Sequence, residues 1–335
     1  MTLAETAFLI TIPNRPSLYD PLENEENTHQ RKEWVLKKMK EADFITEEAY
    51  STALEEEITL SITEKIDHHP NYVTYVHDEL KDLIGKQDGF KDKLQQAVSD
   101  ETQESIQEQW NEQVDDVLAG GVTIHTALDS AKQRHVTEQV DAFLGDGELQ
   151  AGVTMIDHRE HEIIALSGCK QYQKFNFNRA YQAYNQPGSA IKPLLSFVPY
   201  LEFTGVSELS TIDASPFERS GFSPANFGGG VYGRVPIETA FKHSYNTAAV
   251  RMLDQIGIEK AFRYLEPFSF SRVSSQDYIL PSALGTMDMS VLELTDAYTT
   301  FANDGQFKRA RVIRSVKDRN GSVLYEWDDG SAEVW

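Results

Sequence analysis

A serine and a lysine three positions apart, Ser189 and Lys192, are the residues of this chain best suited to chemistry. A serine hydroxyl is a weak nucleophile until a neighbouring base removes its proton, and a lysine three residues further along a helix lies on the same face as the serine. Pro187 and Gly188 indicate a turn before Ser189, and Pro193 is tolerated only in the first turn of a helix. The spacing therefore predicts a nucleophile and its base at the start of a helix.

A second short motif extends this pattern. Ser244 and Asn246 form a Ser-x-Asn triplet, and Ser-x-x-Lys with such a triplet is part of the signature of penicillin-binding proteins and class A β-lactamases. In isolation, Ser189 could be a helix cap, Lys192 a solvated lysine, and the triplet a cap and a turn. The sequence around both motifs favours a catalytic site over that reading.

Stretches along almost the whole chain resemble class A, bifunctional penicillin-binding proteins. They are residues 5–9 (ETAFL), 13–21 (PNRPSLYDP), 120–129 (GGVTIHTALD), 178–180 (NRA), 186–193 (QPGSAIKP), 240–249 (AFKHSYNTAA), 283–286 (ALGT) and 297–305 (AYTTFANDG). By this resemblance, residues 1–60 are the C-terminal tail of a glycosyltransferase domain, residues 61–148 a linker region and residues 149–335 the transpeptidase (penicillin-binding) domain. The implied fold class is α+β, with a β-lactamase-like serine transpeptidase domain after a helical glycosyltransferase tail and a small α/β linker.

The resemblance also implies a function and a role for each residue. The function is that of a peptidoglycan D,D-transpeptidase of bacterial cell-wall synthesis, a penicillin target that forms an acyl-enzyme on D-Ala-D-Ala stem peptides. Ser189 is the attacking group and Lys192 the base, provided that burial or a neighbouring positive charge removes the lysine's proton near neutral pH. Ser244 passes a proton to the leaving nitrogen, and Asn246 binds the lysine and the substrate amide. A related D,D-carboxypeptidase or β-lactamase and a non-catalytic scaffold remain alternatives.

The third motif of the family, Lys-Thr-Gly, does not occur in the sequence. The nearest fragment, residues 203–205 (FTG), lacks the lysine and lies too close to Ser189. In the family, the strand with this motif supplies one of two oxyanion donors, and loss of one such donor costs about 2.7–4 kcal/mol in other hydrolases. We therefore interpret the sequence as truncated at both ends and expect the chain alone to be inactive or weak.

Composition limits the classes of partner. A chain of 335 residues that is 40% hydrophobic can bury a sizeable core in about two domains. The 53 acidic residues outnumber the 31 basic ones, and the net charge of −22 repels nucleic acid. The nine histidines do not show the His-x-x-x-His spacing typical of metal ligands, so we expect no metal and no cofactor. Cys169, the single cysteine, ends an apolar run and is expected to be a buried core residue.

The sequence has neither a signal peptide nor a run of about eighteen apolar residues that could span a membrane. The resemblance nevertheless implies an enzyme at the extracytoplasmic face of the bacterial cell membrane, held there by an anchor absent from this chain. Its implied partners are peptidoglycan stem peptides, lipid-linked precursors and β-lactams. The alternative is that Met1 starts a cytoplasmic protein.

Hydrophobic periodicity predicts the elements that position the two motifs. Helices are expected at residues 31–39, from Thr46 onward, in a polar connector at 64–111 and at 130–143. Further helices are expected from beyond Ser189 through Leu201, at 237–257 and at 290–303. Strands are expected at residues 122–126, in a hairpin of 152–157 with 162–166, and in a second hairpin of 311–317 with 323–327 around an Asn-Gly turn. In the glycine-rich residues 226–233, Asn226 and Tyr232 either line the mouth of a cleft or form a plain turn.

Overall fold

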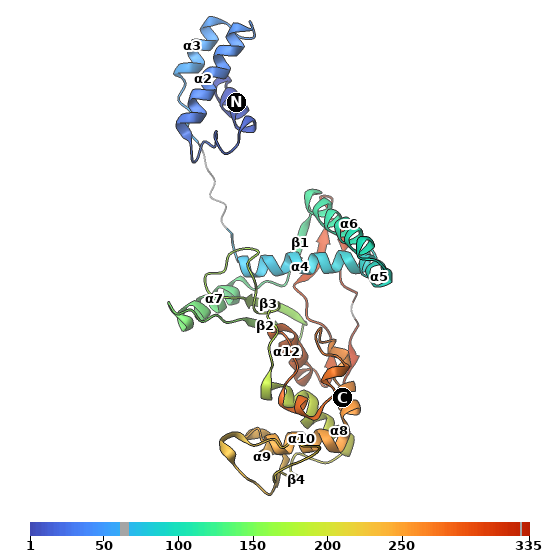
Figure 1. Cartoon of the computed structure of the whole chain (residues 1–335). Helices are drawn as coiled ribbons and strands as arrows, with labels where there is room; N and C mark the ends of the chain where they lie inside the picture. The colour runs from blue at the N-terminus through green and yellow to red at the C-terminus, as the bar shows by residue number, and fades with distance from the viewer. Residues whose placement is uncertain (61–66, 329) are drawn as a thin grey trace. The chain divides into compact units, whose positions relative to one another are not determined.

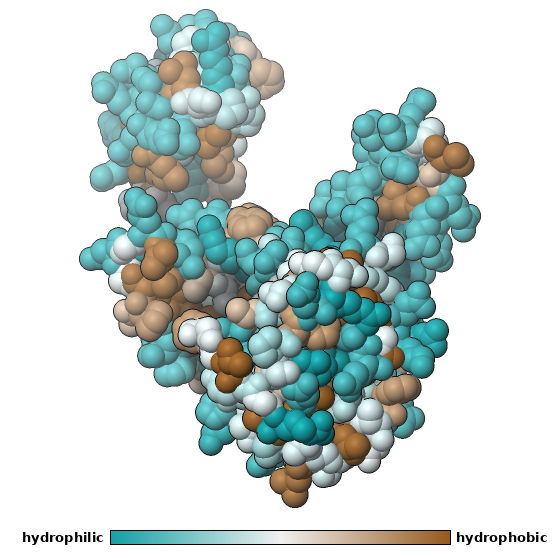
Figure 2. All heavy atoms as spheres, turned by 60° about the horizontal axis from the view of Figure 1, so that its bottom comes forward, coloured by the Kyte–Doolittle hydropathy of each residue, from teal (hydrophilic) through white to brown (hydrophobic). Residues whose placement is uncertain are grey.

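The structure is a computed structural model and describes residues 1–60, 67–328 and 330–335 (Figure 1). Contacts within the chain divide it into two compact units, Met1–Ile66 and Asp67–Trp335. Among the described residues, no helix is long and apolar enough to cross a membrane. The face seen in Figure 2 is mostly hydrophilic, with apolar residues in scattered groups, as expected for a net charge of −22.

The first unit is helical. Its helices are α1 (Leu3–Thr11), α2 (Glu25–Glu41) and α3 (Glu47–Glu55). They pack through small and aliphatic side chains, Ala4, Ala7, Leu36 and Ala53. The helix predicted to begin at Thr46 is confirmed, because the Thr46 hydroxyl accepts a hydrogen bond from the Ala49 N–H at 3.2 Å and caps α3. Residues 61–66, which include the first three residues of the predicted polar connector (64–111), lie outside the described residues.

The second unit mixes helices and short strands. Its helices are α4 (Pro70–Gln87), α5 (Phe90–Gln96), α6 (Asp100–Ala119), α7 (Ser130–Leu144), α8 (Val198–Thr204), α9 (Ile237–Lys242), α10 (Asn246–Ile256), α11 (Ile258–Arg263) and α12 (Val291–Tyr298). Its strands are β1 (Thr123–Thr126), β2 (Val153–Asp157), β3 (Glu162–Ser167), β4 (Thr211–Asp213), β5 (Arg234–Pro236), β6 (Gln306–Phe307), β7 (Ile313–Lys317), β8 (Val323–Tyr325) and β9 (Ala332–Glu333). The α+β class predicted from the sequence is confirmed.

Both predicted hairpins form, and the strand predicted at residues 122–126 joins one of them in a pairing that was not predicted. β2 pairs with β3, and β7 pairs with β8, each antiparallel. β1 joins β7 on its other edge, with Ile124 opposite Val316, so β7 is the central strand of a three-stranded sheet. This sheet therefore joins two distant parts of the second unit, because β1 and β7 are nearly 200 residues apart in the sequence.

The β2–β3 hairpin lies between α7 and α12 (Figure 1). A buried glutamine of α7, Gln133, satisfies the edge of β3: its side-chain oxygen accepts from the Leu166 N–H at 2.9 Å and its amide donates to the Leu166 carbonyl at 2.8 Å. An open strand edge leaves backbone groups unpaired. Gln133 pairs the backbone groups of Leu166 in place of a neighbouring strand.

Cys169 differs from the prediction of a buried strand end. It lies just beyond β3, where the chain leaves the sheet at Gly168, and it is half-buried. Position 168 requires a glycine because Asn178 packs against its backbone, and an added Cβ would lie 2.6 Å from the Asn178 Cα. Burial raises the pKa of the Cys169 thiol, which keeps it protonated and a poor nucleophile.

A buried carboxyl of α4 holds the central strand of the three-stranded sheet. Glu79 is 3% exposed and accepts hydrogen bonds from the backbone N–H groups of Val312 and Ile313, at 3.0 and 2.8 Å, and from the Trp327 indole at 3.1 Å. Burial raises the pKa of Glu79 from 4.5 to about 7, against the opposing effect of these hydrogen bonds and of Arg311. The carboxyl therefore titrates close to neutral pH.

We expect Glu79→Gln to change the pH dependence of stability. Because the folded-state pKa is raised, the stabilisation is complete below pH 4.5 and is lost as the pH rises through about 7. The loss is about 3 kcal/mol, and a neutral glutamine avoids it. Urea unfolding at pH 4.5 and at pH 8 gives the unfolding free energy of the variant minus that of the wild type. This difference should be larger at pH 8 than at pH 4.5 by that amount. Glu112→Gln, at an exposed position of α6, is the control; equal pH profiles for wild type and Glu79→Gln would contradict the assignment.

Candidate active site

Ser189 lies where the sequence predicts, at the start of a helical segment, but its first turns are not α-helical. Residues Gly188–Ile191 form a 3-10 turn, Pro193–Phe197 a π-helical turn, and α8 follows. Proline has no N–H, so Pro193 and Pro199 cannot bond the carbonyls four residues before them. The chain uses the i+3 and i+5 spacings at these places instead: the Lys192 N–H donates to the Ser189 carbonyl, and the Val198 N–H to that of Pro193.

Buried aliphatic side chains fix this segment. Ile191, Leu194 and Leu195 are fully buried in a core that also includes Val250 and Leu253 of α10. Each such side chain contributes about 1.5–3 kcal/mol when buried. Ser189 itself is exposed, on the other side of the segment. The core therefore holds the segment firmly while its serine faces solvent.

Two further contacts hold the Ser189 turn, one from the last residue of α12 and one from the end of the 3-10 turn Leu280–Leu284. The Tyr298 hydroxyl donates to the Ala190 carbonyl at 2.5 Å. Gly285, at φ +78°, touches the backbone of Gly188 so closely that an added Cβ would lie 2.5 Å from the Gly188 nitrogen. Gly188, at φ +56°, is itself in the left-handed region. This backbone contact requires a glycine at position 285.

Lys192 is the most enclosed of the predicted site residues. It is 2% exposed, and its ammonium donates to the Ser244 carbonyl at 2.7 Å, to the Ser244 hydroxyl at 2.9 Å and to the Asn246 Oδ1 at 2.6 Å. These three acceptors match the three hydrogens of an ammonium group. The two sequence motifs therefore meet at the Lys192 nitrogen.

The residues of the Ser-x-Asn motif lie between two helices. Ser244 follows α9 with φ +53°, a left-handed conformation that is uncommon for serine. The turn reverses the chain, so that both the carbonyl and the hydroxyl of Ser244 face Lys192. Asn246 is the first residue of α10, and its Nδ2 donates to the Ala225 carbonyl at 2.7 Å.

Burial sets the proton affinity of the lysine. It lowers the pKa of Lys192 from 10.5 to about 8, because the charged form loses contact with water. At pH 7 about one molecule in ten then carries a neutral amine. The pattern of three acceptors favours the ammonium form, whereas burial makes the neutral form accessible near physiological pH.

The structure brings together three of the four predicted site residues by hydrogen bonds, namely Lys192, Ser244 and Asn246. Within the part of the chain that the structure describes, the Ser189 hydroxyl makes no hydrogen bond; the serine precedes Lys192 by one turn of the same segment. Sequence reasoning missed the Ala225 carbonyl, because any residue type can supply a carbonyl. It also missed the contact of Gly285 with Gly188, although residues 283–286 (ALGT) are among the stretches that carry the family resemblance.

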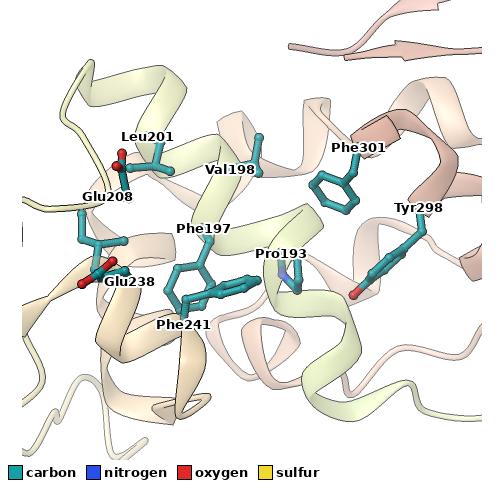
Figure 3. A pocket seen from close by; sticks show the side chains of 10 residues that line it. Pro193, Phe197, Val198, Leu201, Glu208, Glu238, Phe241, Tyr298 and Phe301 are labelled. Carbon is teal, nitrogen blue, oxygen red and sulfur yellow. The ribbon is translucent and has the colours of Figure 1, made fainter. Parts of the chain in front are cut away.

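An apolar groove lies beside the Ser189 segment and does not include the four predicted residues. It has a volume of about 430 Å³, and its lining includes Pro193, Phe197 and Val198. Figure 3 shows the rings of Tyr298 and Phe301 on one side and the carboxylates of Glu208 and Glu238 on the other. Its link to the site is Tyr298, whose hydroxyl bonds the residue after Ser189.

Two sequence features do not contribute to the site. Thr204 ends α8 and Gly205, at φ +66°, caps it, so residues 203–205 form a helix end and not a substitute for a Lys-Thr-Gly strand. Within residues 1–60, 67–328 and 330–335, no group of three or more His, Cys, Asp and Glu side chains could hold a metal ion.

Comparisons with known proteins all indicate one family. Residues 151–333 match the family described as "Penicillin binding protein transpeptidase domain". The whole chain is 45% identical to penicillin-binding protein 4 of Bacillus subtilis (strain 168), and the match covers 54% of that protein. Over 97% of the chain, it is 28% identical to penicillin-binding protein 1A of Aquifex aeolicus (strain VF5), of which 53% is covered. The chain thus spans about half the length of these relatives.

Solved structures share the fold. The crystal structure of penicillin-binding protein 1A from Haemophilus influenzae matches 99% of this chain and 60% of its own, with a TM-score of 0.69 and 18% identity. The PonA1 protein from Mycobacterium tuberculosis in complex with penicillin V matches 77% of this chain and 65% of its own, with a TM-score of 0.61 and 22% identity. The family match, the similarity to the Bacillus protein and the shared fold agree: this chain belongs to the penicillin-binding protein family and contains its transpeptidase domain.

Proposed function

We propose that the protein is a peptidoglycan D,D-transpeptidase that forms an acyl-enzyme at Ser189 on D-Ala-D-Ala stem peptides. The observation that carries this proposal is the buried Lys192 ammonium, held by Ser244 and Asn246 one turn after an exposed serine. Such an arrangement requires a functional explanation, because a lysine is almost never fully buried unless it is paired with a charge. Here its partners are a carbonyl, a hydroxyl and an amide, which leave the amine free to lose its proton.

The first step is the attack of Ser189 on the carbonyl carbon of the penultimate D-Ala. As the bond from the Ser189 oxygen to that carbon forms, Lys192 in its neutral state accepts the hydroxyl proton. The Ser189 N–H lies in the first turn of the segment, where backbone N–H groups have no partner within the helix, and it supplies one oxyanion donor.

In the second step the carbon–nitrogen bond breaks, and the terminal D-Ala leaves as an amine that needs a proton. Of the three groups that accept from Lys192, only the Ser244 hydroxyl can also donate, so it can pass the proton from the lysine to the leaving nitrogen. Asn246 keeps Lys192 in place and can bind the substrate amide. An amine of a second stem peptide then attacks the acyl carbon, the bond from that carbon to the Ser189 oxygen breaks, and the amine proton returns to the Ser189 oxygen through Lys192, which completes the cross-link.

The domain boundaries, the location and the partners that we propose follow from the family of the chain. We infer that residues 1–60 are the tail of a glycosyltransferase domain, residues 61–148 a linker and residues 149–335 the transpeptidase domain. The protein then works at the extracytoplasmic face of the membrane with stem peptides and lipid-linked precursors, and β-lactams acylate it as substrate analogues. The penicillin V complex of the M. tuberculosis relative supports the last inference. Since the sequence has no Lys-Thr-Gly, we expect weak or no activity from this chain by itself.

A fluorescent penicillin tests this proposal. The purified chain, and a longer form of the protein where one exists, are incubated with the label, and any adduct is located by intact and peptide mass. We expect labelling at Ser189 that disappears in Ser189→Ala. Labelling only of the longer form would still support a transpeptidase and would show that this chain needs further residues. No labelling of either form, with the fold intact by circular dichroism, would favour the non-catalytic scaffold.

A further inference from the structure

The glycine-rich residues 225–232, called here the 225–232 loop, have a free tip and a fixed base. At the tip, Phe227 is fully exposed, and Gly228 and Gly229 take the left-handed φ values of +69° and +72°. Its fixed base begins at Asn226, which is only 7% exposed. A buried amide in an exposed loop indicates that the amide holds the loop to the body of the protein.

Asn226 lies on one arm of the loop, and its side chain bonds the other arm and the start of α10. Its Nδ2 donates to the Gly230 carbonyl at 3.0 Å and to the Thr247 hydroxyl at 3.2 Å, and its Oδ1 accepts from the Thr247 N–H at 3.2 Å. The Thr247 hydroxyl donates in turn to the Ala214 carbonyl at 2.8 Å. The base of the loop is therefore locked to the first turn of α10, one residue after Asn246.

The neighbour of Asn226, Ala225, reaches the candidate site through its backbone. Its carbonyl accepts from the Nδ2 of Asn246 at 2.7 Å, while the Oδ1 of Asn246 accepts from Lys192 at 2.6 Å. An amide side chain has donors on one edge and an acceptor on the other. Because Ala225 fixes the donor edge of Asn246, the acceptor edge must face the lysine. Without that carbonyl, a flipped Asn246 would present its NH2 group to an ammonium.

The far end of the loop contacts the same motif. The ring of Tyr232 stacks on the ring of Tyr245, with centroids 4.0 Å apart and planes 14° apart. Tyr245 lies between Ser244 and Asn246, so this stacking restrains the turn that presents both residues to Lys192. The loop thus holds the Ser-x-Asn motif at two places.

We propose that the 225–232 loop sets the orientation of Asn246 and that Asn226 is the positioning residue that locks it. This inference rests on the proposed function, since it concerns the same site, but it assigns no chemical step to Asn226. The residue acts on Lys192 only through the Ala225 carbonyl and the Asn246 amide. The exposed tip of the loop has no part in the positioning.

The test compares Asn226→Ala with Phe227→Ala, a neighbouring substitution at the free tip. The first readout is the side-chain NH2 signal of Asn246 in nitrogen-15 NMR spectra, assigned by its loss in Asn246→Asp. In Asn226→Ala we expect this signal to move to the position of a solvated amide and its proton exchange to become faster. In Phe227→Ala it should stay unchanged. An unchanged Asn246 signal in a folded Asn226→Ala variant would overturn the proposal.

The second readout is the rate of acylation by penicillin. A small misplacement of a catalytic group can cost about a hundredfold in rate, so we expect a decrease of about tenfold to a hundredfold in Asn226→Ala and none in Phe227→Ala. If neither this chain nor the longer form is acylated as wild type, the proposed function fails, and the NMR signal still decides the positioning. If Asn226→Ala does not fold, Tyr232→Leu, which removes the stacking on Tyr245, is measured in its place by the same NMR criterion.

Discussion

Lys192→Met is expected to lower the rate of Ser189 acylation by about a hundredfold to ten-thousandfold, the range over which a positioned base accelerates proton transfer. Methionine fills much of the space of a lysine side chain but can neither take the proton of Ser189 nor donate to Ser244 and Asn246. The measurement is the rate of penicillin adduct formation, in whichever form of the protein is acylated as wild type.

The pH dependence separates the loss of a base from general damage. The base is the neutral amine, and the pKa of Lys192 is about 8. The wild-type rate should therefore increase about tenfold per pH unit below pH 8 and level off above it, whereas Lys192→Met should lack this increase. Lys242→Met is the matched control, because Lys242 ends α9 only two residues before Ser244 but is exposed. A wild-type rate in Lys192→Met would show that another group removes the proton.

The sequence predicts well those features that depend on neighbours along the chain. Ser189 and Lys192 could be paired because three residues separate them, and Thr46 could be placed as a helix start because a cap bonds an N–H three residues on. The hairpins of β2–β3 and β7–β8 follow from alternating apolar residues around a turn. Each of these signals lies within about 18 residues of sequence.

The missed features depend on contacts between distant residues or on the backbone. β1 has four residues, too few to specify a partner, and it pairs with β7 from the other end of the unit. The Ala225 carbonyl orients Asn246, and no side-chain pattern can reveal a carbonyl. Asn226 and Tyr232 could be singled out within a glycine-rich stretch, but their contacts with Thr247 and Tyr245 follow only from the fold. Pro193 indicated the first turn of a helix, but the 3-10 and π-helical turns around it were not predicted.

Gly285→Ala is expected to destabilise the fold by about 2–5 kcal/mol and to slow acylation at Ser189. Two costs combine in this estimate. The φ of +78° strains any residue with a Cβ, and that Cβ would lie 2.5 and 2.6 Å from the nitrogen and Cα of Gly188. Backbone atoms cannot move aside as a flexible side chain does, so the Ser189 turn must shift. The unfolding free energy from urea denaturation measures the first effect, and the rate of penicillin labelling measures the second.

Gly205→Ala separates the two costs. Gly205 caps α8 at φ +66°, close to the φ of Gly285, but an added Cβ there meets nothing within 4 Å. Gly205→Ala should therefore lower the unfolding free energy only by the cost of the left-handed conformation, about 1 kcal/mol. It should leave the acylation rate unchanged. The difference between the two variants isolates the contact of Gly285 with Gly188. Equal losses in both variants, with equal acylation rates, would mean that Gly285 is needed for its φ alone and that its contact with Gly188 does not hold Ser189 in place.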